Sequence, residues 1–75
     1  MAKFSYEIKQ HIGTISATDS LTLELNLISY AKAPAKYDLR RWRVADDGKQ
    51  MNKGVTMTKD ELVALRDLLN SLELK

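Results

Sequence analysis

Hydrophobic and polar residues alternate strictly along one stretch near the middle of the chain. Leucines occupy every second position from residue 21 to residue 27, and polar residues fill the positions between them. Because successive side chains of a β-strand point to opposite faces, this alternation predicts a strand with one buried, leucine-bearing face. The phase breaks at Ile28-Ser29-Tyr30, which predicts a bulge or the end of the strand.

Weaker patterns predict strands on either side of this one. The segment from Phe4 to Ser16 has irregular apolar spacing and predicts either one long bent strand or two short ones. The segment from Lys36 to Val44 alternates and predicts another strand. We expect residues 31–35 to connect it to the leucine strand, because Pro34 cannot donate a ladder hydrogen bond.

A turn and a short strand are predicted next. Asp46-Asp47-Gly48 is a turn signal, because glycine adopts a positive φ at little cost. Gly54 to Met57 then predicts a short fourth strand that leads into the C-terminal segment.

That C-terminal segment has the only clear helical pattern. Thr58 and Glu61 have the spacing of a capping box. Leucines then recur at positions 62, 65, 69 and 72, which is helical spacing. The apolar stripe is broad, so it is either one wide core face or a core face joined to a dimer contact. The chain is therefore predicted to be an α+β protein, with four antiparallel strands and one C-terminal helix in a single domain of residues 1–75.

The chain length favours oligomerisation. A chain of 75 residues without cysteine buries little surface and has no disulfide to stabilise it. A composition of 44% apolar and 29% charged residues argues against disorder. The sequence has no apolar run long enough for a membrane span, and its first residues lack a signal-peptide core. We therefore expect a cytoplasmic protein, with association to the nucleoid as a variant of that location.

Charge is distributed unevenly along the chain. Residues 32–59 hold eight basic and three acidic side chains, a net charge of +5, whereas residues 60–75 have a net charge of −2. A basic middle region indicates either a surface for an anionic partner or an ordinary solvated surface.

One strand combines cations with an aromatic residue. Arg40 and Trp42 lie two residues apart, so both project from one face. An arginine can contact a phosphate, and an indole ring can stack on a base of any identity. Tyr30 is a candidate second platform, and Lys53, before Gly54, is a candidate phosphate contact. The alternative interpretation places Trp42 in the core, with Arg40 packed along its edge.

Catalysis has little support in the sequence. His11 is the only histidine, and the three glycines are too far apart for a phosphate-binding loop. Asp46 and Asp47 lack the ligand spacing of a calcium loop. We expect no enzyme activity, catalytic residue, metal, cofactor or small-molecule substrate.

A family resemblance covers about residues 4–72. The segments Tyr37-Asp38-Leu39-Arg40-Arg41-Trp42 and Asn52-Lys53-Gly54-Val55-Thr56-Met57-Thr58, followed by a leucine-rich helix, resemble the single-stranded-DNA-binding domain of the transcriptional positive-cofactor-four family. The likeness is to its short bacterial YdbC-type members. It implies a strongly bent four-stranded sheet, a homodimer formed through the C-terminal helix, and single-stranded DNA lying across the sheet with little sequence preference.

The resemblance also implies roles for individual residues. Arg40 matches the arginine that contacts the DNA backbone, and Lys53 matches the basic residue before the family glycine. Trp42 falls in the stretch that stacks bases, and Tyr30 is a looser match to an aromatic residue of the preceding hairpin. The serine-rich regulatory tail of the eukaryotic members has no counterpart here.

The sequence thus leads to two hypotheses. In the first, a homodimer binds single-stranded DNA or RNA without sequence preference, in transcription regulation or in DNA replication and repair. Its phosphate contacts are Arg40, Lys53, Arg43 and Lys36, its stacking residues are Trp42 and Tyr30, and its dimer interface consists of Leu62, Leu65, Leu69 and Leu72. In the second, the protein is an interaction module that docks a partner protein through the leucine-rich helix.

Overall fold

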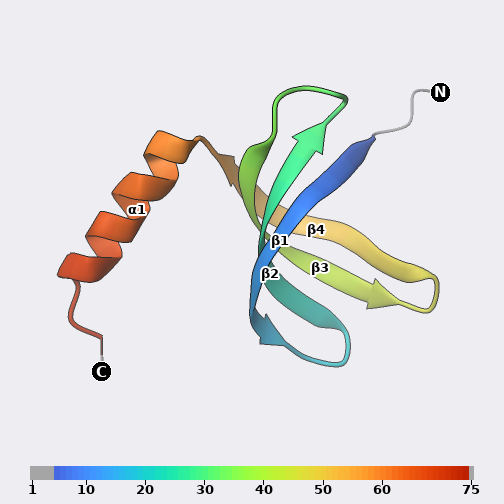
Figure 1. The fold of residues 1–75 in the computed structure, drawn as a ribbon. Helices are drawn as coiled ribbons and strands as arrows, with labels where there is room; N and C mark the ends of the chain where they lie inside the picture. The colour runs from blue at the N-terminus through green and yellow to red at the C-terminus, as the bar shows by residue number, and fades with distance from the viewer. Residues whose placement is uncertain (1–4, 75) are drawn as a thin grey trace.

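The computed structural model describes residues 5–74, which form four strands followed by one helix (Figure 1). The elements are β1 (Tyr6–Ala17), β2 (Leu21–Tyr30), β3 (Lys36–Ala45), β4 (Gly48–Met57) and α1 (Lys59–Ser71). The strands form one antiparallel sheet in the order β1-β2-β3-β4. This arrangement confirms the predicted α+β fold.

The N-terminal strand is long because it contains three irregularities. Its pairing with β2 shifts between Ile8 and Gln10, between His11 and Gly13, and between Thr14 and Ser16. Each shift leaves one extra residue on β1, which bends the strand and increases its twist. One long bent strand is therefore the correct alternative of the two predicted from the sequence.

The fourth strand is longer than the sequence predicts. It begins at Gly48 rather than at Gly54, and its first half pairs with β3 through the tight turn at Asp46 and Asp47. Residues 49–53 are mostly polar and do not alternate, so periodicity could not reveal them. The turn prediction is confirmed, because Gly48 has a φ of 122°.

The two faces of the sheet are buried differently. The leucine face, which we define as Leu21, Leu23, Leu25, Leu27 and Leu39, is only half-buried. The intervening residues of β2 are buried: Thr22, Glu24, Asn26 and Ile28. The prediction that the leucine-bearing face is the buried one is thus wrong for the single chain. The reason is that the sheet curls around its other face, whereas the leucine face has only α1 beside it.

The helix begins as predicted and remains loosely packed. The Thr58 hydroxyl accepts from the Glu61 backbone N–H at 3.1 Å, and the Thr58 N–H donates to the Glu61 carboxylate at 2.8 Å, which confirms the capping box. The helix lies against β3 and β4 and stands apart from the rest of the sheet (Figure 1). None of its described residues is buried.

Candidate functional site

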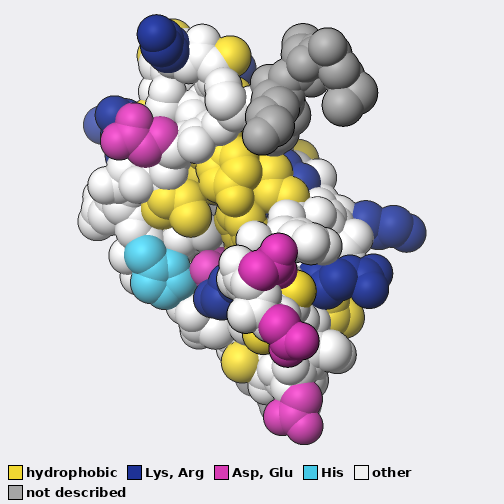
Figure 2. Space-filling model, turned by 90° about the vertical axis from the view of Figure 1, so that its right-hand side faces the viewer, with side chains coloured by type: hydrophobic (Ala, Val, Ile, Leu, Met, Phe, Trp, Pro, Cys, Tyr) yellow, Lys and Arg dark blue, Asp and Glu magenta, His cyan; other side chains and the backbone are white. Residues whose placement is uncertain are grey.

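The face opposite the leucines forms a curved polar surface with aromatic rings. The ring centroids of Tyr6 and Trp42 are 5.9 Å apart, and those of Tyr6 and Tyr30 are 6.4 Å apart. Tyr6 lies on β1 and Trp42 on β3, which are separated by β2, so the sheet must curl for these rings to meet. Figure 2 shows hydrophobic side chains at the centre of one side of the molecule, with acidic and basic side chains around them. We call this surface the polar face; its members include Tyr6, His11, Thr22, Glu24, Asn26, Tyr30, Asp38, Arg40 and Trp42.

A buried ion pair anchors the polar face. Asp38 is completely buried and accepts two hydrogen bonds from Arg40, from Nε and from Nη2, each at 2.9 Å. The Tyr30 hydroxyl donates to the same carboxylate at 2.5 Å. Burial and this hydrogen bond raise the pKa of Tyr30 to about 12, and the hydrogen bond to Asp38 raises the pKa of Arg40. Arg40 and Tyr30 were both predicted to contact nucleic acid, and their shared hydrogen bonds to Asp38 bring them together.

Gly54 is required for the position of Arg40. A Cβ at residue 54 would lie 2.5 Å from Arg40 Cβ and 2.7 Å from Arg40 Cα. The arginine stem therefore crosses β4 where only glycine fits, and Nη1 donates to the Asn52 carbonyl at 2.8 Å. The close approach at this glycine is therefore made by Arg40 within the chain.

A second polar network surrounds Glu24. The alternation along β2 predicts a solvent-facing position for this residue. Its carboxylate oxygen Oε2 accepts from Thr22 at 2.7 Å and from the ammonium of Lys49. Burial alone would raise the pKa of Glu24, but the hydrogen bonds from Lys49, Thr22 and Asn26 and the charge of Lys49 outweigh it and lower the pKa. The carboxylate is thus held ionised. A polar residue at every second position of a strand was the only sequence signal for this network.

Trp42 is part of the interior rather than an open platform. Only 2% of its surface is exposed, and the ring of Tyr6 lies over it at a 52° tilt. The interpretation of Trp42 as a core residue therefore describes this conformation, and its ring is not open for base stacking. Its indole Nε1 is buried, and no hydrogen-bond partner is found for it.

The predicted cations lie at different places. Lys36 pairs with Ile28 and so shares the polar face, and Lys53 is exposed beside the irregularity in β4. Arg43 pairs with Leu21 and therefore projects from the leucine face. Arg43, a predicted phosphate contact, therefore lies on the side opposite Trp42, because neighbouring residues of a regular strand point to opposite sides.

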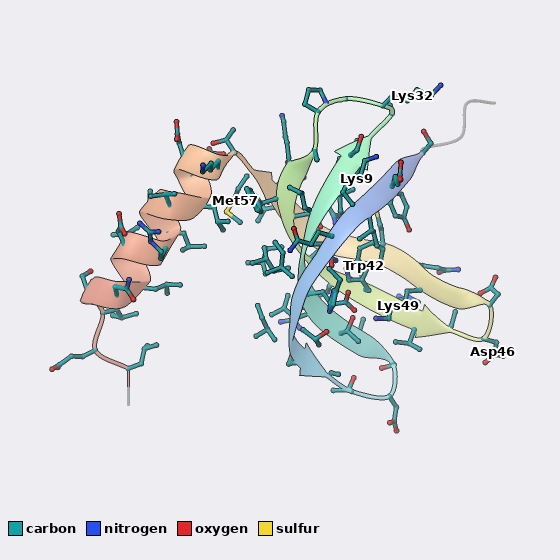
Figure 3. The ribbon with its side chains drawn as sticks, in the orientation of Figure 1. Lys9, Lys32, Trp42, Asp46, Lys49 and Met57 are labelled. Carbon is teal, nitrogen blue, oxygen red and sulfur yellow. The ribbon has the colours of Figure 1, made fainter. Side chains whose placement is uncertain are left out.

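An apolar groove runs between α1 and the leucine face, with a cavity volume of about 470 Å³. Met57 lies at its edge, where β4 leads into the helix (Figure 3). Of the leucines predicted at a dimer interface, Leu62, Leu65 and Leu69 line this groove, whereas Leu72 is exposed at the C-cap. We call this feature the leucine groove.

Neither a metal-binding cluster nor a membrane-spanning helix is found in the described part of the chain. Residues 5–74 contain no group of three or more histidine, cysteine or acidic side chains that could hold a metal ion. Within the same range, α1 is too short and too polar to cross a membrane.

Comparison with known proteins identifies a bacterial relative. The chain is 49% identical over 72 residues to a protein of Treponema pallidum (strain Nichols) described as uncharacterized, and the match covers 95% of this chain and 82% of the relative. The two chains belong to one family. No family model matches the sequence.

Proposed function

We propose that the protein is a non-enzymatic homodimer that binds single-stranded nucleic acid through its polar face. The observation that carries this proposal is the cluster of Tyr6, Tyr30 and Trp42 on a curled sheet, with Lys36 and Lys53 exposed nearby. Aromatic rings beside cations suit a flexible strand that offers bases and phosphates together. Tyr6 is 37% exposed and is the ring best placed to meet a base.

The resemblance to the positive-cofactor-four family supports the same function. That resemblance leads one to expect a bent four-stranded sheet, a capped C-terminal helix and a glycine after a lysine, and this chain has all three. Under this proposal the protein works in transcription or in DNA replication and repair, in the cytoplasm.

The leucine groove supports the dimer. Leu69 and Leu72 are about half exposed in the single chain, at 49% and 55%. Burying a leucine side chain fully is worth about 1.5–3 kcal/mol, so covering several of them with a second copy strongly favours association. A C2 dimer would apply the same contact twice.

The roles of the individual residues differ under this proposal. Lys36 and Lys53 contact phosphates, and Tyr6 stacks a base. Arg40 holds the sheet in shape through Asp38 and has only part of its guanidinium left for a strand. Its side chain is 15% exposed, so any phosphate contact it makes is at the edge of the group.

Fluorescence anisotropy with a labelled twenty-base oligothymidine tests the proposal. We expect tight, salt-sensitive binding to the single strand and much weaker binding to a duplex of the same length. Lys53→Ala should flatten the plot of log affinity against log salt by about 0.7, the value for one lost single-strand phosphate contact. Lys59→Ala is the matched control, because Lys59 is an exposed lysine on α1. Equal binding to both nucleic acids, or none, would contradict the proposal.

The leucine groove also favours a second candidate, an interaction module that docks a helix of another protein. In that case the isolated protein sediments as a monomer and shows no salt-dependent affinity for oligothymidine. A dimer that binds the single strand would exclude this alternative.

A further inference from the structure

A small cavity opens on the polar face beside the buried tryptophan. Its volume is about 290 Å³, just below the roughly 300–1,000 Å³ range of ligand sites, which suits one planar group. We call it the Trp42 pocket; its lining residues are Tyr6, Ile8, His11, Glu24, Asn26, Trp42 and Lys49. Trp42 and Lys49 are marked in Figure 3 beneath β1.

Trp42 lines the pocket, and its buried indole N–H has no hydrogen-bond partner among the described residues. Only 2% of the Trp42 surface is exposed. A buried polar group left unsatisfied is destabilising, so an acceptor that reaches this N–H would be favourable. The rest of the lining cannot supply one in this conformation.

The pocket also offers an acceptor. Of the two oxygens of Glu24, Oε2 is used by Thr22 and Lys49. Oε1 has only distant partners, the Asn26 amide at 3.5 Å and His11 Nδ1 at 3.7 Å. His11 Nδ1 instead donates to Asn26 Oδ1 at 2.7 Å, so Oε1 keeps capacity to accept from a ligand.

The donor and the acceptor lie on the same side of neighbouring strands. Trp42 pairs with Thr22, and Glu24 is two residues further along β2, so the two side chains are diagonal neighbours. Tyr6 and Ile8 add apolar walls from β1. This combination fits a flat heterocycle that carries an acceptor and a donor side by side on one edge.

We propose that the Trp42 pocket takes up the Watson–Crick edge of one unpaired base of the bound strand. The indole N–H of Trp42 donates to the ring acceptor or carbonyl of the base, and Glu24 Oε1 accepts from its imino or amino group. This inference rests on the proposed function and deepens it. In a duplex, base pairing occupies that edge, so a paired base cannot form these hydrogen bonds with the pocket. The pocket would therefore favour single strands over double strands.

The single tryptophan makes the proposal directly measurable. With one tryptophan in the chain, a ¹⁵N-labelled sample gives one indole N–H resonance. We expect oligothymidine to move this resonance to lower field, as a hydrogen bond forms. An oligomer of N3-methylthymidine has the same charge and rings but no N3–H donor, and we expect its affinity to be about three- to tenfold lower, as for one lost hydrogen bond.

A variant of the chain provides the complementary test. Glu24→Gln keeps the shape of the side chain but replaces the charged carboxylate by a neutral amide, which is a weaker acceptor. The variant should therefore show a smaller difference in affinity between oligothymidine and the N3-methylated strand. Lys59→Ala, on the helix, should leave that difference unchanged. A thermal unfolding curve for each variant separates a binding effect from a loss of fold.

The possible results distinguish a failure of the pocket proposal from a failure of the proposed strand binding. If oligothymidine binds but the indole resonance stays in place and N3-methylation has no effect, the pocket proposal is overturned while strand binding holds. If no single strand binds at all, the proposed function fails and the pocket proposal fails with it. A shifted resonance together with discrimination against the methylated strand supports both.

Discussion

The two faces of the sheet differ in how far a single chain buries them. On the polar face, the largest fully buried side chains, Trp42, Ile28, Asn26 and Asp38, are covered within one chain. On the leucine face the apolar residues are half-buried, and α1 has no buried residue. Under the proposed dimer, the strongest hydrophobic pattern of this short chain marks a surface for association, while polar networks hold the interior of the single chain.

Removing the ion pair of the polar face should have the largest effect on the stability of the protein. Asp38→Ala leaves the largely buried guanidinium of Arg40 without its counter-ion, and we expect the free energy of unfolding to fall by about 3–5 kcal/mol. Urea denaturation followed by circular dichroism measures it. Asp67→Ala, at an exposed ion pair on α1, should change stability by less than about 1 kcal/mol. Equal losses in the two variants would show that Asp38 does not anchor the face.

The leucine face should respond through association instead. Leu65→Asp places a charge in the leucine groove of both copies, and we expect the dimer dissociation constant to rise roughly hundredfold or more. Sedimentation equilibrium measures that constant. Leu68→Asp is the matched control, because Leu68 is 67% exposed and does not line the groove. If both variants weaken the dimer to the same extent, the groove is not its interface.

A substitution at Gly54 tests the packing of the polar face. Gly54→Ala forces its Cβ against the Cα and Cβ of Arg40, and we expect a loss of about 1–3 kcal/mol from overpacking. Gly13→Ala has no atom within 4 Å of the new Cβ and serves as the control. Chemical denaturation of both variants should show a loss only for Gly54; a neutral Gly54→Ala would mean that Arg40 does not cross β4 closely.

Acid should lower the stability of the folded protein by protonating Glu24. Its folded-state pKa is lowered, so its stabilising effect is present above the unfolded-state pKa of about 4.5 and is lost as the pH falls through the folded-state pKa. Thermal melts between neutral and acid pH should show this loss in the wild type. Glu24→Gln should show a smaller dependence in the same range; an identical pH profile for the two proteins would exclude Glu24 as a source.

The smallest expected effect concerns the β2–β3 turn. Ala31 and Lys32 have φ values of 49° and 66°, and Ala33 N–H donates to the Tyr30 carbonyl at 2.8 Å. A left-handed conformation costs a non-glycine residue about 1–2 kcal/mol, and the added chain entropy of glycine offsets about half of that. Lys32→Gly should therefore stabilise the protein by about 0.5–1 kcal/mol in a denaturant titration. A lower midpoint than that of the wild type would contradict this account of the turn.

Much of the fold could be predicted from local patterns. The capping box at Thr58 and Glu61 and the turn before Gly48 are local signals, and the structure confirms both. The sequence predicted a bend in β1 but not the positions of its three irregularities, because each extra residue shifts the phase of alternation. The first half of β4 was missed because its position depends on pairing with β3, which no local pattern reveals.

Only part of the candidate site could be predicted from the sequence. The shared face of Asp38, Arg40 and Trp42 followed from strand alternation, but their burial did not. Burial depends on the curl of the sheet, which brings Tyr6 of β1 over Trp42. The buried role of Glu24 was likewise hidden, because a polar residue between leucines is typical of a solvent-facing position.

The most direct test of the account is native mass spectrometry of the protein with and without oligothymidine. We predict that the free protein has twice the 8.5 kDa mass of the chain, and that the strand adds to this dimer without dissociating it. Such a result would assign association and strand binding to separate surfaces. A single chain of 8.5 kDa in both samples, with no bound strand, would contradict both halves of the account.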